Sequence, residues 1–242
     1  MDIIIHPEFD WAFELVKNQH DIVPGHTLVA AFEAKVNFSL GLKQVEGYHF
    51  SSHSLIFGCS RLLAPFKMDA HRGLDYAYGI RALHLYGVYT TFKHERVQNN
   101  RLQFKALEIL YSEGDEFRLR IGNHAWDRIM IYLQNFGSVP ATIKHYHDYY
   151  PPAFDHKNYI YQGRGTPGER VKYHCILLLG YNSQCRYFSY LNSWGSDFGN
   201  NGRAYVDFKN VVRAYAPLFE EDQQYFEDSQ MIMGRDPLPA PA

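Results

Sequence analysis

The spacing of hydrophobic and polar positions changes character near residue 100. In the first hundred residues, apolar side chains recur three and four positions apart, which is typical of amphipathic helices. One such run covers residues 27–36 after Pro24, and another covers residues 73–86 and ends at Gly87. The second half carries alternating or continuous apolar runs divided by Asn, Ser and Gly, with one helix at 126–136. The strands that we expect there are 102–111, 117–121, 139–144, 173–181, 186–191 and 203–208.

This order of elements predicts an α+β fold, with a helical lobe at about residues 12–105 and a β lobe at about 106–215. A chain of 242 residues is long enough to bury a sizeable core. The domain as a whole is expected to cover residues 1–215, and residues 216–242 form a tail that is acidic at first and then rich in Pro and Ala. This composition is typical of a mobile chain end, and a docking segment is the alternative interpretation.

Composition narrows the classes of partner. The formal net charge is −2, so neither nucleic acid nor an anionic membrane is expected as the main partner. No apolar run approaches the ~20 residues of a membrane span, and the first residues do not resemble a secretory signal. The three cysteines, Cys59, Cys175 and Cys185, show neither metal-binding spacing nor a disulfide framework. We therefore expect a reducing intracellular compartment, the cytoplasm, and no metal or other cofactor.

Three blocks of sequence carry candidate chemistry. His174 opens an apolar strand that ends in Gly180-Tyr181, and Asn192 begins the run Asn-Ser-Trp-Gly followed by a Gly-rich turn. Gln19 lies just ahead of the first predicted buried helix. Taken alone, each of these residues is more often structural or solvated than catalytic. Considered together, His174 and Asn192 suggest a specific contact, because an Asn at the end of one strand can hydrogen-bond an imidazole on a neighbouring strand.

The three blocks resemble the signature of papain-like cysteine peptidases, over about residues 10–208. The resemblance implies a two-lobed fold, with a mainly helical N-terminal lobe, a β-barrel-like C-terminal lobe and a cleft between them. It further implies that His174 is the catalytic histidine and that Asn192 orients it. By the same resemblance, Trp194 shields their contact and Gln19 donates to the oxyanion hole.

The sequence departs from this family at the nucleophile. The family places a cysteine six residues after its glutamine, and here Gly25 stands six residues after Gln19. Glycine has no side chain to attack a carbonyl, and loss of the nucleophile in a comparable triad lowers turnover on the order of a million-fold. Thr27 is a poor substitute, because two positions along a helix turn a side chain to another face.

Further departures surround the same site. The tryptophan that follows the family's nucleophile is replaced by His26. The glycine pair that lines the family's substrate groove corresponds to Arg72-Gly73, where a large side chain would hinder pairing with an extended peptide. The two ends of a family disulfide correspond to Ile22 and Ala70, so this bridge is absent.

These features predict a catalytically inactive homologue that serves as a protein-binding or scaffold subunit of a larger assembly. The alternative is an active, or engineered-inactive, papain-like endopeptidase. Pro24 and His26 argue against a single engineered change at Gly25, since both neighbours also differ from the family.

A metal site is a further alternative at the vacated position. His26 and His174, with His20 and Asp21 nearby, supply imidazole and carboxylate groups of the kind that zinc prefers. Their spacing resembles no known metal motif, so we expect no metal there.

Overall fold

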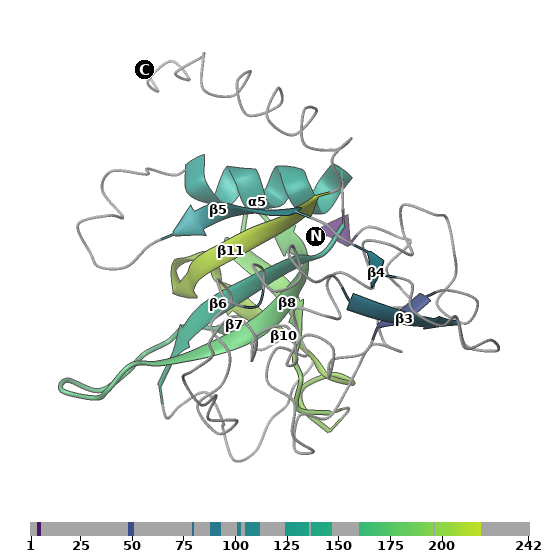
Figure 1. Cartoon of the computed structure of the whole chain (residues 1–242). Coiled ribbons are helices and arrows are strands. Elements are labelled where there is room, and N and C mark those ends of the chain that lie inside the picture. Colours follow the sequence, from purple (N-terminus) through teal and green to yellow (C-terminus); the bar gives the residue numbers. More distant parts are fainter. Residues whose placement is uncertain are drawn as a thin grey trace, which may run out of the picture.

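The computed structural model describes residues 4–5, 48–50, 79, 88–92, 101–102, 105–111, 124–135, 137–146, 160–195 and 197–218. Within these ranges the elements longer than one residue are, in chain order, strands, one α-helix and one 3₁₀ turn (Figure 1). They are β1 (Ile4–Ile5), β2 (Tyr48–Phe50), β3 (Val88–Phe92), β4 (Arg101–Leu102), β5 (Lys105–Tyr111), α5 (His124–Asn135), β6 (Val139–His145), β7 (Ile160–Tyr161), β8 (Lys172–Asn182), β9 (Tyr187–Leu191), β10 (Arg203–Asp207), η5 (Phe208–Asn210) and β11 (Val211–Leu218).

Most of these strands form one sheet in the order β5-β11-β6-β8-β9-β10-β7, and β1 also pairs with β8. Neighbours are antiparallel except β7 and β10, which are parallel. A separate three-stranded sheet has the order β2-β3-β4. The large sheet is open, which corrects the expected β-barrel-like lobe. Its described edges are β5 and the two-residue strand β7, and these two strands do not pair with each other.

Helix α5 lies across the sheet close to β5 and β11 (Figure 1). Its inward positions follow helical spacing: Ile129 and Leu133 are buried, and Trp126 and Met130 pack partly buried against the core. The helix ends at Asn135, two residues before Gly137, whose φ of 109° is accessible to glycine and whose N–H donates to the carbonyl of Tyr132 at 3.2 Å. The predicted stop at this glycine is therefore confirmed, although the helix begins at His124, two residues earlier than expected.

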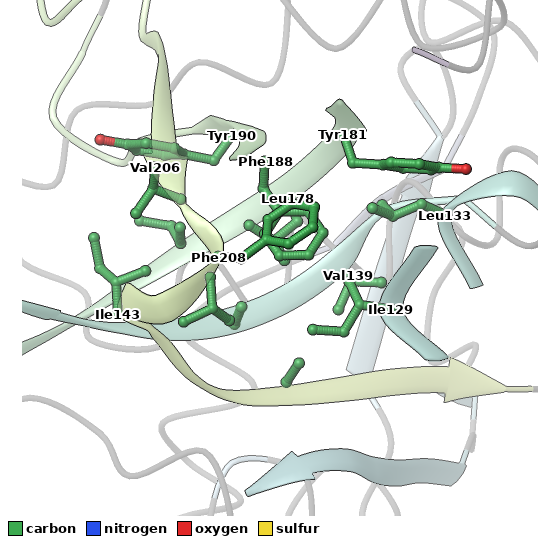
Figure 2. Close-up of a cluster of buried hydrophobic side chains, with 14 of the residues drawn as sticks. Ile129, Leu133, Val139, Ile143, Leu178, Tyr181, Phe188, Tyr190, Val206 and Phe208 are labelled. Carbon is green, nitrogen blue, oxygen red and sulfur yellow. The ribbon is translucent and has the colours of Figure 1, made fainter. Parts of the chain in front are cut away.

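The core lies between α5 and the sheet, where β8 and β9 are apolar over most of their length (Figure 2). Phe188 and Phe208 stack with ring centroids 4.2 Å apart, and Leu178 lies beside them. All three are almost fully buried. Burying a Phe or Leu side chain contributes about 1.5–3 kcal/mol, so this cluster holds β8, β9 and η5 together.

The predicted strands of the second half that fall on described residues agree with the structure in place, with differences at their ends. The expected strand 102–111 is two strands, β4 and β5, and Phe208 opens η5 instead of ending β10. The sequence reading missed β11, which extends three residues beyond the expected domain end at residue 215.

The first hundred residues contain strands β2 and β3, although we expected mainly helix there. Gly79, inside the predicted helix 73–86, is helical. The predicted helix 27–36, the predicted strand 117–121 and the tail beyond residue 218 lie outside the described residues. Within the described part of the chain, no helix has the length and apolar character needed to cross a membrane.

Candidate active site

His174 lies where β8 passes from solvent into the core. The strand begins with exposed Lys172 and Tyr173, continues through half-buried His174 and Cys175, and is buried from Ile176 onward. On one side it pairs with β6, where Ile143 is the partner of His174. The imidazole is therefore held on a paired strand, at the boundary between core and surface.

Asn192 follows β9 directly and reaches the histidine of the neighbouring strand. Its side-chain oxygen lies 2.7 Å from Nε2 of His174, and Asn192 is 2% exposed. The same oxygen accepts the backbone N–H of Ser193 at 2.8 Å, which identifies it as oxygen and not nitrogen. An amide oxygen only accepts, so Nε2 of His174 must carry the hydrogen. In the neutral ring, Nδ1 is then the basic nitrogen.

Trp194 covers this contact, with its ring centroid 4.4 Å from that of His174 and the two planes 31° apart. Phe198 packs edge-on against the indole at 5.3 Å. The structure therefore brings together His174, Asn192 and Trp194, the three second-half residues that the sequence singled out.

The Gly-rich turn after Trp194 fixes the backbone of Asn192. The N–H of Asn192 donates to the carbonyl of Gly202 at 2.8 Å, and the N–H of Gly202 donates to the carbonyl of Phe198 at 2.7 Å. Gly199 has a φ of 57°, and a Cβ there would overlap the carbonyl oxygen of Arg203. Only glycine fits this position, which gives the run after Asn-Ser-Trp-Gly a structural purpose of its own.

The pKa of His174 is lowered from 6.5 to about 4. Burial is the main cause, because it disfavours the charged imidazolium, and the hydrogen bond to Asn192 acts in the opposite direction. His145 lowers the pKa further by charge repulsion. Near pH 7 the ring is therefore neutral, with its hydrogen on Nε2 and a lone pair on Nδ1.

His145 is a neighbour that sequence reasoning missed. It ends β6, pairs in register with Lys172, and lies edge-on to His174 with ring centroids 6.1 Å apart. The alternation of β6 places it on the same face as Ile143. The two-residue spacing of Ile143 and His145 in the sequence indicates that both lie on one face of a strand. That His145 lies near His174 follows only from the register between β6 and β8.

The remaining predicted site residues lie outside the described residues: Gln19, Gly25, His26, Arg72 and Gly73. The members of the metal alternative other than His174 also lie outside them. Within the described ranges, no group of three His, Cys, Asp or Glu side chains is placed to hold a metal ion.

Comparison with known protein families gives a match that covers the candidate active site of the second half. The sequence profile of the papain family of cysteine proteases matches residues 69–215. This chain belongs to the papain family. The match includes His174, Asn192 and Trp194, and it begins after Gly25. A comparison with curated protein sequences gives no significant match.

Solved structures show the same fold at low sequence identity. The cysteine protease CMS1MS2 of Carica candamarcensis superposes with a TM-score of 0.57 at 14% identity, covering 87% of this chain and 97% of that one. Bromelain protease from Ananas comosus gives 0.56 at 12% identity, covering 87% and 98%. Xylellain, a cysteine protease from Xylella fastidiosa, gives 0.55 at 14% identity, covering 84% and 82%. At these identities the likeness shows the fold, which is papain-like.

Proposed function

We propose that this chain is a papain-family member that has lost its nucleophile and acts as a protein-binding or scaffold subunit. The domain would extend to about residue 215, with the acidic tail beyond it. The absence of a disulfide framework among its three cysteines supports a reducing intracellular compartment, with the cytoplasm as our proposal.

The observation that supports this proposal is a contrast between the His174–Asn192 pair, which is retained, and the sequence position of the nucleophile, which is a glycine. His174 and Asn192 keep a short hydrogen bond under the Trp194 ring. The position that would supply the thiol, six residues after Gln19, is occupied by Gly25. A thiolate made nucleophilic by its surroundings is what a cysteine peptidase requires.

The electrostatics of His174 agree with a neutral base. Its pKa of about 4 leaves the ring neutral at pH 7, with an unprotonated Nδ1. Such a ring could accept a proton from a thiol, but no cysteine occurs before Cys59. The retained contacts instead contribute to folding, since the side chain of Asn192 links β9 to His174 on β8 and the turn after it leads into β10.

The alternative function is peptide-bond hydrolysis by an active or engineered-inactive endopeptidase. The intact pair of His174 and Asn192 favours it. Against it stand Pro24 and His26, which flank Gly25 and also differ from the family, and Arg72 in place of a groove glycine.

A turnover assay separates the two functions. The protein is incubated with a panel of fluorogenic peptides and with an irreversible thiol-directed peptidase probe. We expect neither cleavage nor rapid labelling. Turnover that disappears in a His174→Ala variant would overturn the proposal in favour of hydrolysis.

The scaffold role is tested separately in native extracts. We expect the protein to migrate with partners by size-exclusion chromatography. A single species at the mass of the lone chain, 28.2 kDa, would contradict a role as a subunit.

A further inference from the structure

A basic arm, residues 162–173, joins β7 to β8 and projects beyond the sheet (Figure 1). It presents three exposed cations: Arg164, Arg170 and Lys172. Tyr173, where the arm meets β8, is 62% exposed, an unusual value for a large aromatic residue. The basic arm therefore combines an exposed ring with positive charge.

The arm is fixed at its base. Gly165 lies so close to the ring of Tyr146 that a Cβ would overlap it. Tyr146 in turn donates its N–H to the hydroxyl of Tyr161 at 2.9 Å. On the other side of the base, the side-chain amide of Asn210 donates to the carbonyl of Tyr161 at 3.3 Å. These contacts position the arm before any partner arrives, which reduces the entropy lost on binding.

The turn of the arm is closed by its one carboxylate. Glu169 accepts hydrogen bonds from the N–H and the hydroxyl of Thr166, at 3.0 and 3.1 Å. Glu169 is thus committed to the turn, while Arg170 and Lys172 remain exposed.

The arm is positively charged, whereas the chain as a whole is slightly negative. Residues 137–146 and 160–175, which form β6, the arm and the start of β8, contain four Lys or Arg residues and one carboxylate. The whole chain carries a formal net charge of −2. The arm is therefore a local positive surface on a slightly acidic protein, and such a surface attracts anionic segments.

The arm borders the candidate active site. Lys172 and His174 lie two positions apart on β8 and so share a face of the strand. His145 pairs with Lys172, and its ring lies 6.1 Å from that of His174. A ligand bound along the arm would extend toward the face that carries His174.

We propose that the basic arm docks an acidic polypeptide segment of a partner protein. This rests on the proposed protein-binding function and names the chemistry of the partner. Arg170 and Lys172 pair with its carboxylates, whereas Tyr173, next to Lys172 on β8, projects from the opposite face of the strand. Nucleic acid fits less well, because three exposed arm cations fall short of the roughly 6–10 phosphate contacts of a salt-sensitive DNA-binding protein.

The experiment measures anisotropy of a labelled Glu-rich peptide and of the same peptide with Gln at every Glu. We expect the Glu peptide to bind more tightly, and Arg170→Glu or Lys172→Glu to weaken its binding about tenfold, which corresponds to about 1.4 kcal/mol. The control is Arg128→Glu, the same charge reversal at an exposed position on α5, and it should leave binding unchanged.

Three results would overturn the docking proposal: equal binding of both peptides, equal losses in the arm and α5 variants, or tighter binding of single-stranded DNA of matched charge. Cleavage of the peptides is followed in the same samples. Cleavage that requires His174 overturns the proposed function alone, whereas absence of arm-dependent binding without cleavage overturns the docking proposal alone.

Discussion

The two halves of strand β8 differ in burial and in the role we assign to them. From Ile176 to Asn182 every residue is buried, and the strand is held by β6 or β1 on one side and by β9 on the other. From Lys172 to Cys175 the side chains are exposed or half-buried, and they include His174. The buried half defines the fold, and the half nearer to solvent carries the candidate chemistry.

This difference agrees with our proposal, in which the fold persists although the nucleophile is lost. Nothing in the core formed by Leu178, Phe188 and Phe208 requires a nucleophile. The contact of His174 with Asn192 depends on the Gly-rich turn after Trp194, which also connects the core strands β9 and β10. Substitutions should therefore separate stability, which follows the buried half, from the chemistry of the half nearer to solvent.

The largest expected effect comes from the buried half. Leu178→Ala should lower the free energy of unfolding by about 2–5 kcal/mol, because it leaves a cavity in a fully buried site. The matched change on the other half, Tyr173→Ala, should stay within about 0.5 kcal/mol. Denaturant titration followed by tryptophan fluorescence measures both. Equal losses would show that the halves are not energetically distinct.

The next effect concerns pH and the ring of His174. Its pKa of about 4 lies below the ordinary value of 6.5, so the unfolded chain takes up the proton first as pH falls. The stability contributed by this neutral ring is fully present above pH 6.5 and falls as the pH drops toward 4. The total loss by pH 4 is about 3 kcal/mol.

A His174→Gln variant isolates this contribution from those of the other histidines. Between pH 7 and pH 4, the free energy of unfolding of this variant should fall by about 3 kcal/mol less than that of the unsubstituted protein. Identical pH profiles for the two proteins would mean that the imidazole is not buried as the structure shows.

The smallest of these effects tests the glycine turn. Gly199→Ala places a Cβ against the carbonyl of Arg203 at a φ of 57° and should cost about 1–3 kcal/mol. Gly168→Ala, at a φ of 82° with open space around it, should cost only about 1 kcal/mol. Thermal unfolding compares them, and a larger loss for Gly168→Ala would contradict the role assigned to the turn.

The sequence was sufficient for elements whose signals are local. The stop of α5 at Gly137 and the apolar run of β8 could be predicted because each depends on neighbouring residues. The pairing of His174 with Asn192 was predicted only through the family resemblance, since they belong to two strands whose register the spacing does not give.

Elements that depend on distant partners were missed or wrong. Strand β11 contains Arg213 and Pro217, which interrupt the apolar pattern, and it is stabilised by pairing with β5 and β6. Whether the sheet closes depends on its two edges, β5 and β7, which are far apart in the chain. His145 was missed for the same reason, because its proximity to His174 follows from the register of β6 on β8.

The central proposal is that Gly25 occupies the sequence position of the nucleophile, in a protein whose His174 imidazole is neutral and could accept a proton. The most direct test is to introduce Gly25→Cys and measure labelling by the thiol-directed probe at pH 7, with exposed Cys185 as the internal reference. We predict labelling at least about tenfold faster than at Cys185, because a neighbouring imidazole can take up the proton of the thiol and, once charged, stabilise the thiolate. Adding His174→Ala should abolish this advantage. Labelling at the rate of Cys185, unchanged by His174→Ala, would contradict the placement of Gly25 at the active site.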